Sequence, residues 1–191
     1  MPDLIGYGAH GRDLAAIFAR AHPGRILRLY DDDTSKNLPP ASNATRHILI
    51  GINNPNQRRQ VAEKYGNGFG APKAIVDPSA IIGTDVHLGR GVVIAPLVIL
   101  LHSVTLGQHC HVNYHASMTR CVVGDYSTIS PGATICGSVT IGEECLIGAG
   151  AIICDRVKIG DGVIVGAGSV VLPASIIPNG TTVVGVWKSE R

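Results

Sequence analysis

The sequence predicts a small α/β unit followed by a parallel β-solenoid. Three observations carry this prediction: glycines follow a short apolar run near the start, aliphatic residues recur on every sixth position later, and aromatic residues are scarce. Apolar residues make up 45% of the 191 residues and aromatic residues only 4%, beside 24 glycines and 11 prolines. Thin repeated layers of Val and Ile fit this composition better than a core built on aromatic rings.

The first third of the chain has the pattern of an α/β unit. Apolar runs at 4–5, 26–30 and 47–52 alternate with two helical patterns, at 15–18 and 56–65. We therefore expect the order strand, loop, helix, strand, strand, helix around a small parallel sheet. The first strand should be short, because only two apolar residues precede its loop. Either this edge of the sheet is reduced, or the natural start lies upstream.

Glycines or acidic residues follow the predicted strands. The loop GYGAHGR comes after the first run, three aspartates from Asp31 to Asp33 follow the second, and the third leads into IGINN. Glycines at such a place bring backbone N–H groups and a helix N-terminus against a phosphate, and acidic groups after the second strand accept hydrogen bonds from sugar hydroxyls. The pattern favours a site for a phosphorylated ligand that carries a sugar.

Aliphatic residues then recur with a period of six. The ladder consists of Ile82, Leu88, Ile94, Leu100, Leu106, Val112 and Met118, and then of Val123, Ile129, Ile135, Ile141, Ile147, Ile153, Ile159, Val165 and Val171. Glycine often follows the ladder position, where a chain that turns a tight corner needs a residue without a Cβ. A helix would repeat its apolar face every three to four residues and would not tolerate so many glycines. The period therefore predicts a β-helix in which each flat face takes one hexapeptide.

One step of the ladder is five residues long instead of six. It runs from Met118 to Val123, within the stretch HVNYHASMTRCVVGDY at 111–126. One residue is therefore missing from a coil of the predicted β-helix.

Charge, cysteine content and hydropathy limit which kinds of partner and which cell compartment the sequence favours. The formal net charge is +2 without a cluster of Lys or Arg, which argues against nucleic acid or an anionic membrane and favours a small-molecule partner. The five cysteines occur singly, as expected for reduced thiols in the cytoplasm. No signal-peptide pattern opens the sequence, and the most apolar late stretch, 163–172, is too short to span a membrane.

Residues 75–186 look like the hexapeptide-repeat acyltransferases, which form a left-handed parallel β-helix. Together with GYGAHGR, the aspartates, IGINN and the closing segment GAGSVVLPASIIPNGTTVVGVWK, they resemble the NeuD/PglD-like family of sugar acyltransferases over nearly the whole chain. The resemblance implies a Rossmann-like α/β domain over 1–72 that binds a nucleotide sugar. It implies a left-handed β-helix acyltransferase domain with a C-terminal tail over 73–191.

The resemblance also implies a function. In the family the β-helix binds acetyl-CoA, and the acceptor is a nucleotide-linked amino sugar or, for O-acetylating members, sialic acid. We therefore expect a cytoplasmic enzyme of bacterial glycan biosynthesis that moves an acetyl group from acetyl-CoA to a sugar amine or hydroxyl, without a metal. We also expect a homotrimer, since family members cover one flank of the β-helix in trimers whose active sites lie between subunits.

The binding positions of the family carry over to this sequence residue by residue. The glycine loop matches the family's phosphate side, the first two aspartates match the pair that faces the nucleoside, and IGINN supplies the glycine after the third strand. The predicted acceptor-binding residues are Gly8, Ala9, His10, Asp31, Asp32 and Gly51, and the predicted coenzyme-binding residues are Thr128, Ala149 and Ala167.

The catalytic base of the family has no counterpart at its usual place. The family uses a histidine in a stretch like N-x-x-x-x-x-x-H-[DE]-C, and the matching stretch here runs from Asn113 to Cys121. It offers only Thr119 and Arg120 where the family has an acidic residue or glycine, then histidine, then an acidic residue. Threonine has no useful basicity and arginine stays protonated, so neither replaces the base.

Two other histidines are candidates for the base. His102 lies two places after the inward Leu100, so it is predicted one coil below the missing base at the same corner. His115 is predicted on a neighbouring corner. His109 and His111 are less well placed, because His111 directly precedes an inward residue. For each of these histidines the alternative is a solvated or intersubunit side chain.

Three alternatives stay open at this point. The chain could be a relative that binds the ligands but has lost the chemistry together with the base. Zinc would suit a histidine cluster, as in γ-class carbonic anhydrases, but their G-H-x-x-x-x-H spacing is absent here. Trp187 stands where the family tail has proline, either as a hydrophobic cap on the solenoid or as a platform for the adenine of the coenzyme.

Overall fold

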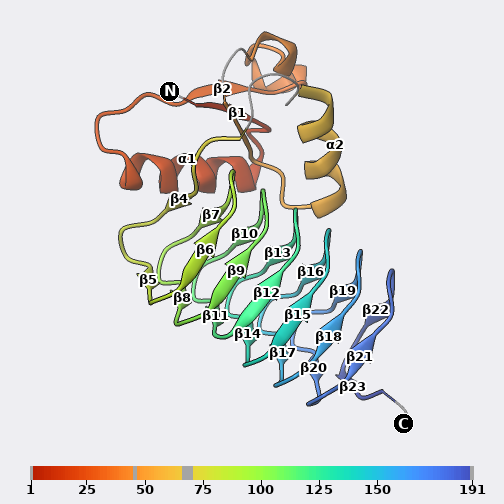
Figure 1. Ribbon diagram of the computed structural model, residues 1–191. Coiled ribbons are helices and arrows are strands. Elements are labelled where there is room, and N and C mark those ends of the chain that lie inside the picture. The colour runs from red at the N-terminus through yellow and green to blue at the C-terminus, as the bar shows by residue number, and fades with distance from the viewer. Residues whose placement is uncertain (1, 45–46, 66–70, 190–191) are drawn as a thin grey trace.

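The computed structural model describes residues 2–44, 47–65 and 71–189. A small α/β unit packs along the side of the first coils of a long β-solenoid, and the chain ends at the far end of the solenoid (Figure 1). The predicted division between residues 72 and 73 falls between the last helix of the α/β unit and the first strand of the solenoid. No helix in the described part is long and apolar enough to cross a membrane.

The α/β unit has the predicted order of elements. These are β1 (Asp3–Ile5), α1 (Ala9–Ala21), β2 (Arg28–Tyr30), the 3-10 turns η1 (Thr34–Lys36) and η2 (Ala41–Asn43), β3 (Ile48–Ile50) and α2 (Pro55–Tyr65). The strands are parallel in the order β2-β1-β3. The first strand is short as expected, but it is the central strand and not an edge, because it pairs with both of the others.

Glycines let the loops after β1 and β3 approach each other closely. A Cβ on Gly11 would stand 1.9 Å from the carbonyl oxygen of Gly6, and a Cβ on Gly51 would stand 2.3 Å from the same oxygen. Any larger residue would push the start of α1 away from the sheet. The glycine loop is thus fixed by close backbone packing at the carboxyl ends of the strands.

The solenoid is a stack of short parallel strands that form three sheets of seven, seven and six strands within the described residues. The strands are β4 (Ile75–Val76), β5 (Ile81–Ile82), β6 (Val86–Leu88), β7 (Val93–Ile94), β8 (Ile99–Leu100), β9 (Val104–Leu106), β10 (His111–Val112), β11 (Ser117–Met118), β12 (Cys121–Val123), β13 (Thr128–Ile129), β14 (Thr134–Ile135), β15 (Val139–Ile141), β16 (Leu146–Ile147), β17 (Ile152–Ile153), β18 (Lys158–Ile159), β19 (Ile164–Val165), β20 (Val170–Val171), β21 (Ile176–Ile177), β22 (Thr182–Val183) and β23 (Val186–Trp187).

The predicted ladder forms the core of the solenoid. From Ile94 to Val171 every ladder side chain is at most 3% exposed, and together they line the inside of the coils. The prediction is wrong for Ile82, which is 39% exposed. Its strand β5 is the terminal strand of its sheet, so no further coil covers it.

The five-residue step shortens one coil of the solenoid. Val123 pairs with Ile141, eighteen residues later, whereas Met118 pairs with Ile135, only seventeen residues later. The sheets stay in register above and below this coil. The loss is therefore absorbed at a corner and not within a strand.

Candidate functional site

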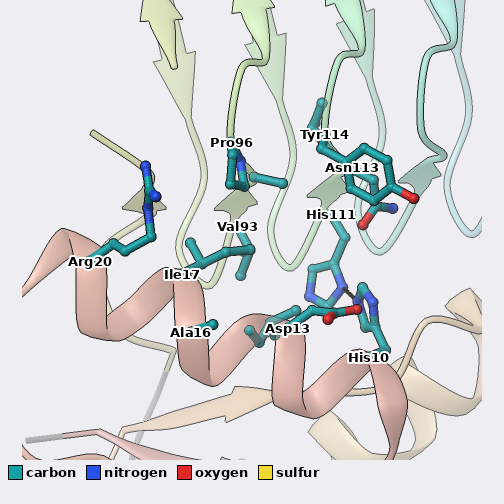
Figure 2. A pocket seen from close by; sticks show the side chains of 13 residues that line it. His10, Asp13, Ala16, Ile17, Arg20, Val93, Pro96, His111, Asn113 and Tyr114 are labelled. Carbon is teal, nitrogen blue, oxygen red and sulfur yellow. Dashed lines mark hydrogen bonds between the residues drawn. The ribbon is translucent and has the colours of Figure 1, made fainter. Parts of the chain in front are cut away.

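A pocket lies between α1 and the first coils of the solenoid (Figure 2). Helix α1 contributes His10, Asp13 and Ile17 to its wall, and the solenoid contributes Asn113 and Tyr114 among others. The close-up shows His10 and His111 pointing toward one another at one end of this pocket. The pocket thus joins the glycine-loop side of the α/β unit to the coil that contains the missing residue.

The two histidines form a buried hydrogen-bonded pair. Nε2 of His10 lies 2.9 Å from Nδ1 of His111, and the ring centroids are 5.0 Å apart. Burial first, and then the charge of Arg58, lower the pKa of His10 to about 4, although Asp13 opposes them. Burial, followed by Arg58, also holds the pKa of His111 well below its usual value. Both rings are therefore neutral near pH 7, and one nitrogen donates to the other.

The structure gathers the predicted acceptor-binding residues at the carboxyl edge of the sheet. Gly8 is the N-cap of α1 without a side-chain cap, and Ala9 and His10 begin the helix, whose first turn has no acidic residue. Its leading N–H groups are thus open to an anion. Gly51 packs against the same loop.

The two predicted aspartates differ in their partners. Asp31 is buried and accepts from the amides of Tyr7 at 2.6 Å and Asp33 at 2.9 Å, with Lys36 at 2.7 Å. Burial raises the pKa of Asp31, but the bonds from Lys36 and the two amides outweigh it and the pKa is lowered. Asp32 is exposed and accepts from the hydroxyl of Tyr65 at 2.7 Å. Asp31 therefore ties two loops together, whereas the exposed Asp32 also accepts from the amide of Ala41 at 2.9 Å.

Arg58 of α2 holds the α/β unit to the solenoid and was not among the predicted residues. Its guanidinium is fully buried and donates to Thr128 Oγ1 at 2.9 Å. Its other hydrogen bonds go to backbone carbonyl oxygens. The carbonyl partners belong to Ile52, Asn53, His109, Tyr126 and Ser127. No carboxylate pairs with it among the described residues. Nothing in its local sequence distinguishes it from the neighbouring Arg59.

Thr128 lies inside this joint. Its side chain is fully buried, and its hydroxyl donates to the carbonyl oxygen of Asn53 at 3.0 Å while it accepts from Arg58. This placement leaves no surface of Thr128 for a coenzyme to touch. The other two predicted coenzyme residues, Ala149 and Ala167, are exposed and stacked along one edge of the solenoid, where Gly168 N donates to Ala149 O at 2.8 Å.

The missing residue is the one that would stand above His102. Two residues, Thr119 and Arg120, connect β11 to β12, where three connect β8 to β9 one coil below. Arg120 and Ser103 have similar positive φ angles, of 43° and 51°. The amide of Arg120 donates to the carbonyl oxygen of His102, and the amide of Ser103 donates in the same way to the carbonyl oxygen of Thr84. Arg120 therefore takes the place of Ser103 and not of His102. The corner position that would carry the family's base therefore has no residue of its own in this coil.

The side chain of Arg120 reaches Gly137 in the next coil. A Cβ on Gly137, in the next coil, would stand 2.2 Å from the Nη2 atom of Arg120. Below it, Nδ1 of His102 lies 3.5 Å from Oγ1 of Thr119. A shallow hollow lined by Thr119, Arg120, Gly137 and Asp155 opens at this corner.

The two predicted base histidines lie on different edges of the solenoid. His102 is exposed on the edge between β8 and β9, beside Thr119. His115 is exposed between β10 and β11, with its ring edge-on to Tyr114 at 6.0 Å. It shares that edge with Ala149 and Ala167. Within one chain these histidines do not meet at one site.

Two further expectations concern the ends of the solenoid and metals. Trp187 is partly buried and packs against the hydrophobic core, as a cap would. Among the described residues no group of three or more His, Cys, Asp or Glu side chains is arranged to hold a metal ion.

Family models and a curated relative match the solenoid. Residues 65–145 match the GMPPB C-terminal domain, and residues 138–173 match the bacterial transferase hexapeptide with six repeats. The GDP-perosamine N-acetyltransferase of Escherichia coli O157:H7 is 32% identical over 97 residues, which are 50% of this chain and 44% of that relative. The chain therefore spans less than half the length of this relative.

Solved structures match over nearly the whole chain. The acetyltransferase domain of PglB from Neisseria gonorrhoeae FA1090, in complex with acetyl coenzyme A, has a TM-score of 0.85 and 28% identity over 95% of this chain and 94% of that one. WeeI from Acinetobacter baumannii AYE has a TM-score of 0.82 and 27% identity over 97% and 96%. In its α/β unit, its coils of hexapeptides and its glycine loop, the chain is similar to the NeuD/PglD-like hexapeptide-repeat acyltransferases, and it shares their left-handed β-helix fold.

Proposed function

We propose that this protein transfers an acetyl group from acetyl-CoA to a sugar, with the amine of a nucleotide-linked amino sugar as the preferred acceptor. The main support is the match, over nearly the whole chain, to an acetyltransferase domain that binds acetyl coenzyme A. The curated relative is an N-acetyltransferase named for a GDP-linked sugar. Both relatives favour an acetyl donor and an acceptor held through a nucleotide.

The acceptor binds at the carboxyl edge of the α/β sheet in this proposal. The phosphates of the nucleotide accept from the open N–H groups at the start of α1, next to Gly8, Ala9 and His10. The exposed carboxylate of Asp32 accepts from ribose hydroxyls. Asp31 acts indirectly, because its bonds to Tyr7 and Asp33 fix the loops that form the site.

The donor binds along the edge of the solenoid that carries Ala149 and Ala167. Small side chains leave room there for the coenzyme, and a neighbouring subunit of a homotrimer closes the other side. The acceptor nitrogen attacks the thioester carbonyl, the new C–N bond forms as the C–S bond breaks, and CoA leaves as a thiol. Backbone N–H groups of the coils stabilise the oxyanion.

A base must take the proton of the acceptor nitrogen. We assign this role to His102, whose exposed ring lies one coil below the missing position, beside Thr119. His115 is the second candidate. An amine that loses its proton to solvent before it binds needs a base less than a hydroxyl does, so the lost residue is more compatible with N-acetylation than with O-acetylation.

A second function rests on the same lost residue. The position above His102 is deleted, and the side chain of Arg120 lies close by, against Gly137. A protein that binds both ligands without turnover is therefore also consistent with the site. The acceptor site would then bind its ligand without any acetyl transfer.

Thiol release from acetyl-CoA separates the two functions. We would assay wild type, His102→Ala and His115→Ala against UDP-, dTDP- and GDP-linked 4-amino sugars, with binding of both ligands measured by calorimetry. Turnover by wild type, with a loss of about 10²-fold in kcat in one variant that still binds both ligands, supports the enzyme and identifies its base. Binding of acetyl-CoA or nucleotide without turnover on any acceptor supports the binding protein.

A further inference from the structure

A second hollow, of about 480 Å³, opens at the C-terminal end of α1, away from the glycine loop. Its wall is made by the end of α1, the residue before β3, the segment that leads into β4 and one corner of the first coil. Five of its side chains carry basic nitrogens: His22, Arg25, His47, Lys73 and Arg90. Neither the proposed acceptor site nor the proposed donor edge includes any of them.

The permanent cations of the hollow are Arg25, Lys73 and Arg90. No Asp or Glu is among the described residues that line the hollow. Within the described residues Arg25, Lys73 and Arg90 have no carboxylate within ion-pair distance. Other basic side chains do have one, namely Arg20, Arg28, Lys36 and Arg59. Because the whole chain carries a net charge of only +2, this hollow concentrates positive charge locally.

The parts of the hollow are held in place by hydrogen bonds. Arg90 Nε donates to Ala71 O at 2.7 Å, and the amide of Gly91 donates to Pro72 O at 2.8 Å, which fixes the linker to the first coil. The amide of Arg25 donates to His22 O at 3.1 Å, in the turn after α1. The cations therefore come from separate segments that converge on one fixed concave surface.

The lining also contains apolar side chains. Phe18 and Ile75 contribute to it and are 1% and 3% exposed, so they belong to the core and offer only their outer atoms. A volume of this size is within the range of pockets that hold small organic ligands. Three permanent cations suit a dianion, and guanidinium groups form paired hydrogen bonds with phosphate oxygens.

We propose that this hollow binds a small organic phosphate, with its phosphate group against Arg25, Lys73 and Arg90 and its apolar part toward Phe18 and Ile75. The site is separate from the proposed nucleotide site at Gly8 to His10. It does not depend on the acetyltransferase activity, so either proposal can fail without the other.

Calorimetric titration with phenyl phosphate at low ionic strength tests this site. We expect saturable binding to one site, with inorganic phosphate weaker by about threefold because it lacks an apolar part. Arg25→Gln and Lys73→Gln should each weaken the binding of phenyl phosphate by about fivefold or more. Lys158→Gln, which removes an exposed cation from a distant strand, should leave it unchanged. Thermal unfolding confirms that the variants are folded.

Three results would overturn the proposal. The first is binding that fails to saturate, or that is equal in wild type and the Arg25 and Lys73 variants. The second is binding that is lost in His10→Gln but kept in Arg25→Gln, because the phosphate would then occupy the glycine loop. The third is sedimentation with phosphatidylglycerol vesicles without binding of phenyl phosphate, because the ligand would then be a lipid headgroup and not a soluble phosphate.

Discussion

The corner between β11 and β12 shows how the loss of one residue changes the chemistry that a coil can offer. The deleted position is the one that would project a side chain above His102, and Arg120 turns the corner in its place. Its guanidinium lies so close to Gly137 that a Cβ there would collide with it. This corner therefore offers a permanent cation, which cannot accept a proton, where a base is expected.

Insertion of a histidine between Thr119 and Arg120 should restore both the six-residue step and the base. We expect kcat for acetyl transfer to rise by about 10²-fold, the usual contribution of a general base. Insertion of alanine at the same place is the matched control, since it restores the coil length without an imidazole. Steady-state thiol release checks this, and an equal effect of the two insertions would show that coil length alone matters.

The buried histidines should make the protein less stable in mild acid. Burial, assisted by Arg58, lowers the pKa of His10 and of His109 from 6.5 to about 4. The unfolded chain takes up these protons near pH 6.5, but the folded chain does so only near pH 4. Their contribution is therefore fully present above pH 6.5 and is lost as the pH falls toward 4. Each histidine contributes a slope of about 1.4 kcal/mol per pH unit within this window.

Urea unfolding between about pH 7 and pH 4.5 measures this slope. His109→Gln should flatten it, because the variant removes one of the protons that only the unfolded chain binds at mildly acidic pH. His87→Gln is the control, since that side chain is 70% exposed. A slope that both variants leave unchanged would exclude His109 as its source.

Helix α2 is attached to the solenoid mainly through one side chain. Arg58→Met should destabilise the protein by about 3 kcal/mol or more, because it leaves several buried carbonyl groups and Thr128 without their donor. Arg59→Met is the matched control on the same helix, where partly exposed ion pairs with Glu63 and Glu144 are worth less than about 1 kcal/mol. Equal losses in urea unfolding would mean that Arg58 does not anchor the helix.

Local patterns predicted the elements far better than the joint between them. The six-residue period and the glycine loop depend on neighbours in sequence, so they identified the coils and the order of the α/β unit. The contacts of His10 with His111 and of Arg58 with His109 join residues that are 101 and 51 positions apart. No short pattern encodes such pairs. Thr128 was assigned to the coenzyme from the family resemblance. Only the packing of α2 against the solenoid shows that it is buried.

The outer faces of the solenoid carry aliphatic side chains that suggest how subunits associate. On the sheet that contains β5, β17 and β23, Ile81 is 57% exposed, Ile152 is 41% exposed and Val186 is 70% exposed. They lie in one row on this face of the sheet, in which Ser117 and Thr134 stand between Ile81 and Ile152. We predict that the chain forms a homotrimer in which this sheet is covered, because burial of the row would remove apolar surface from water.

Ile152→Glu places a charge in the middle of this row and should convert the trimer to monomers, since an unpaired buried charge opposes association. Val122→Glu is the matched control, because Val122 is 50% exposed on β12 of a different sheet. Sedimentation equilibrium measures the molar mass, and so the number of subunits, for wild type and both variants. If acetyl transfer needs two subunits, Ile152→Glu should lose activity together with the trimer, and dilution of wild type should lower its specific activity. A monomeric wild type would contradict the predicted trimer, and a trimer broken only by Val122→Glu would place the subunit contact on another sheet.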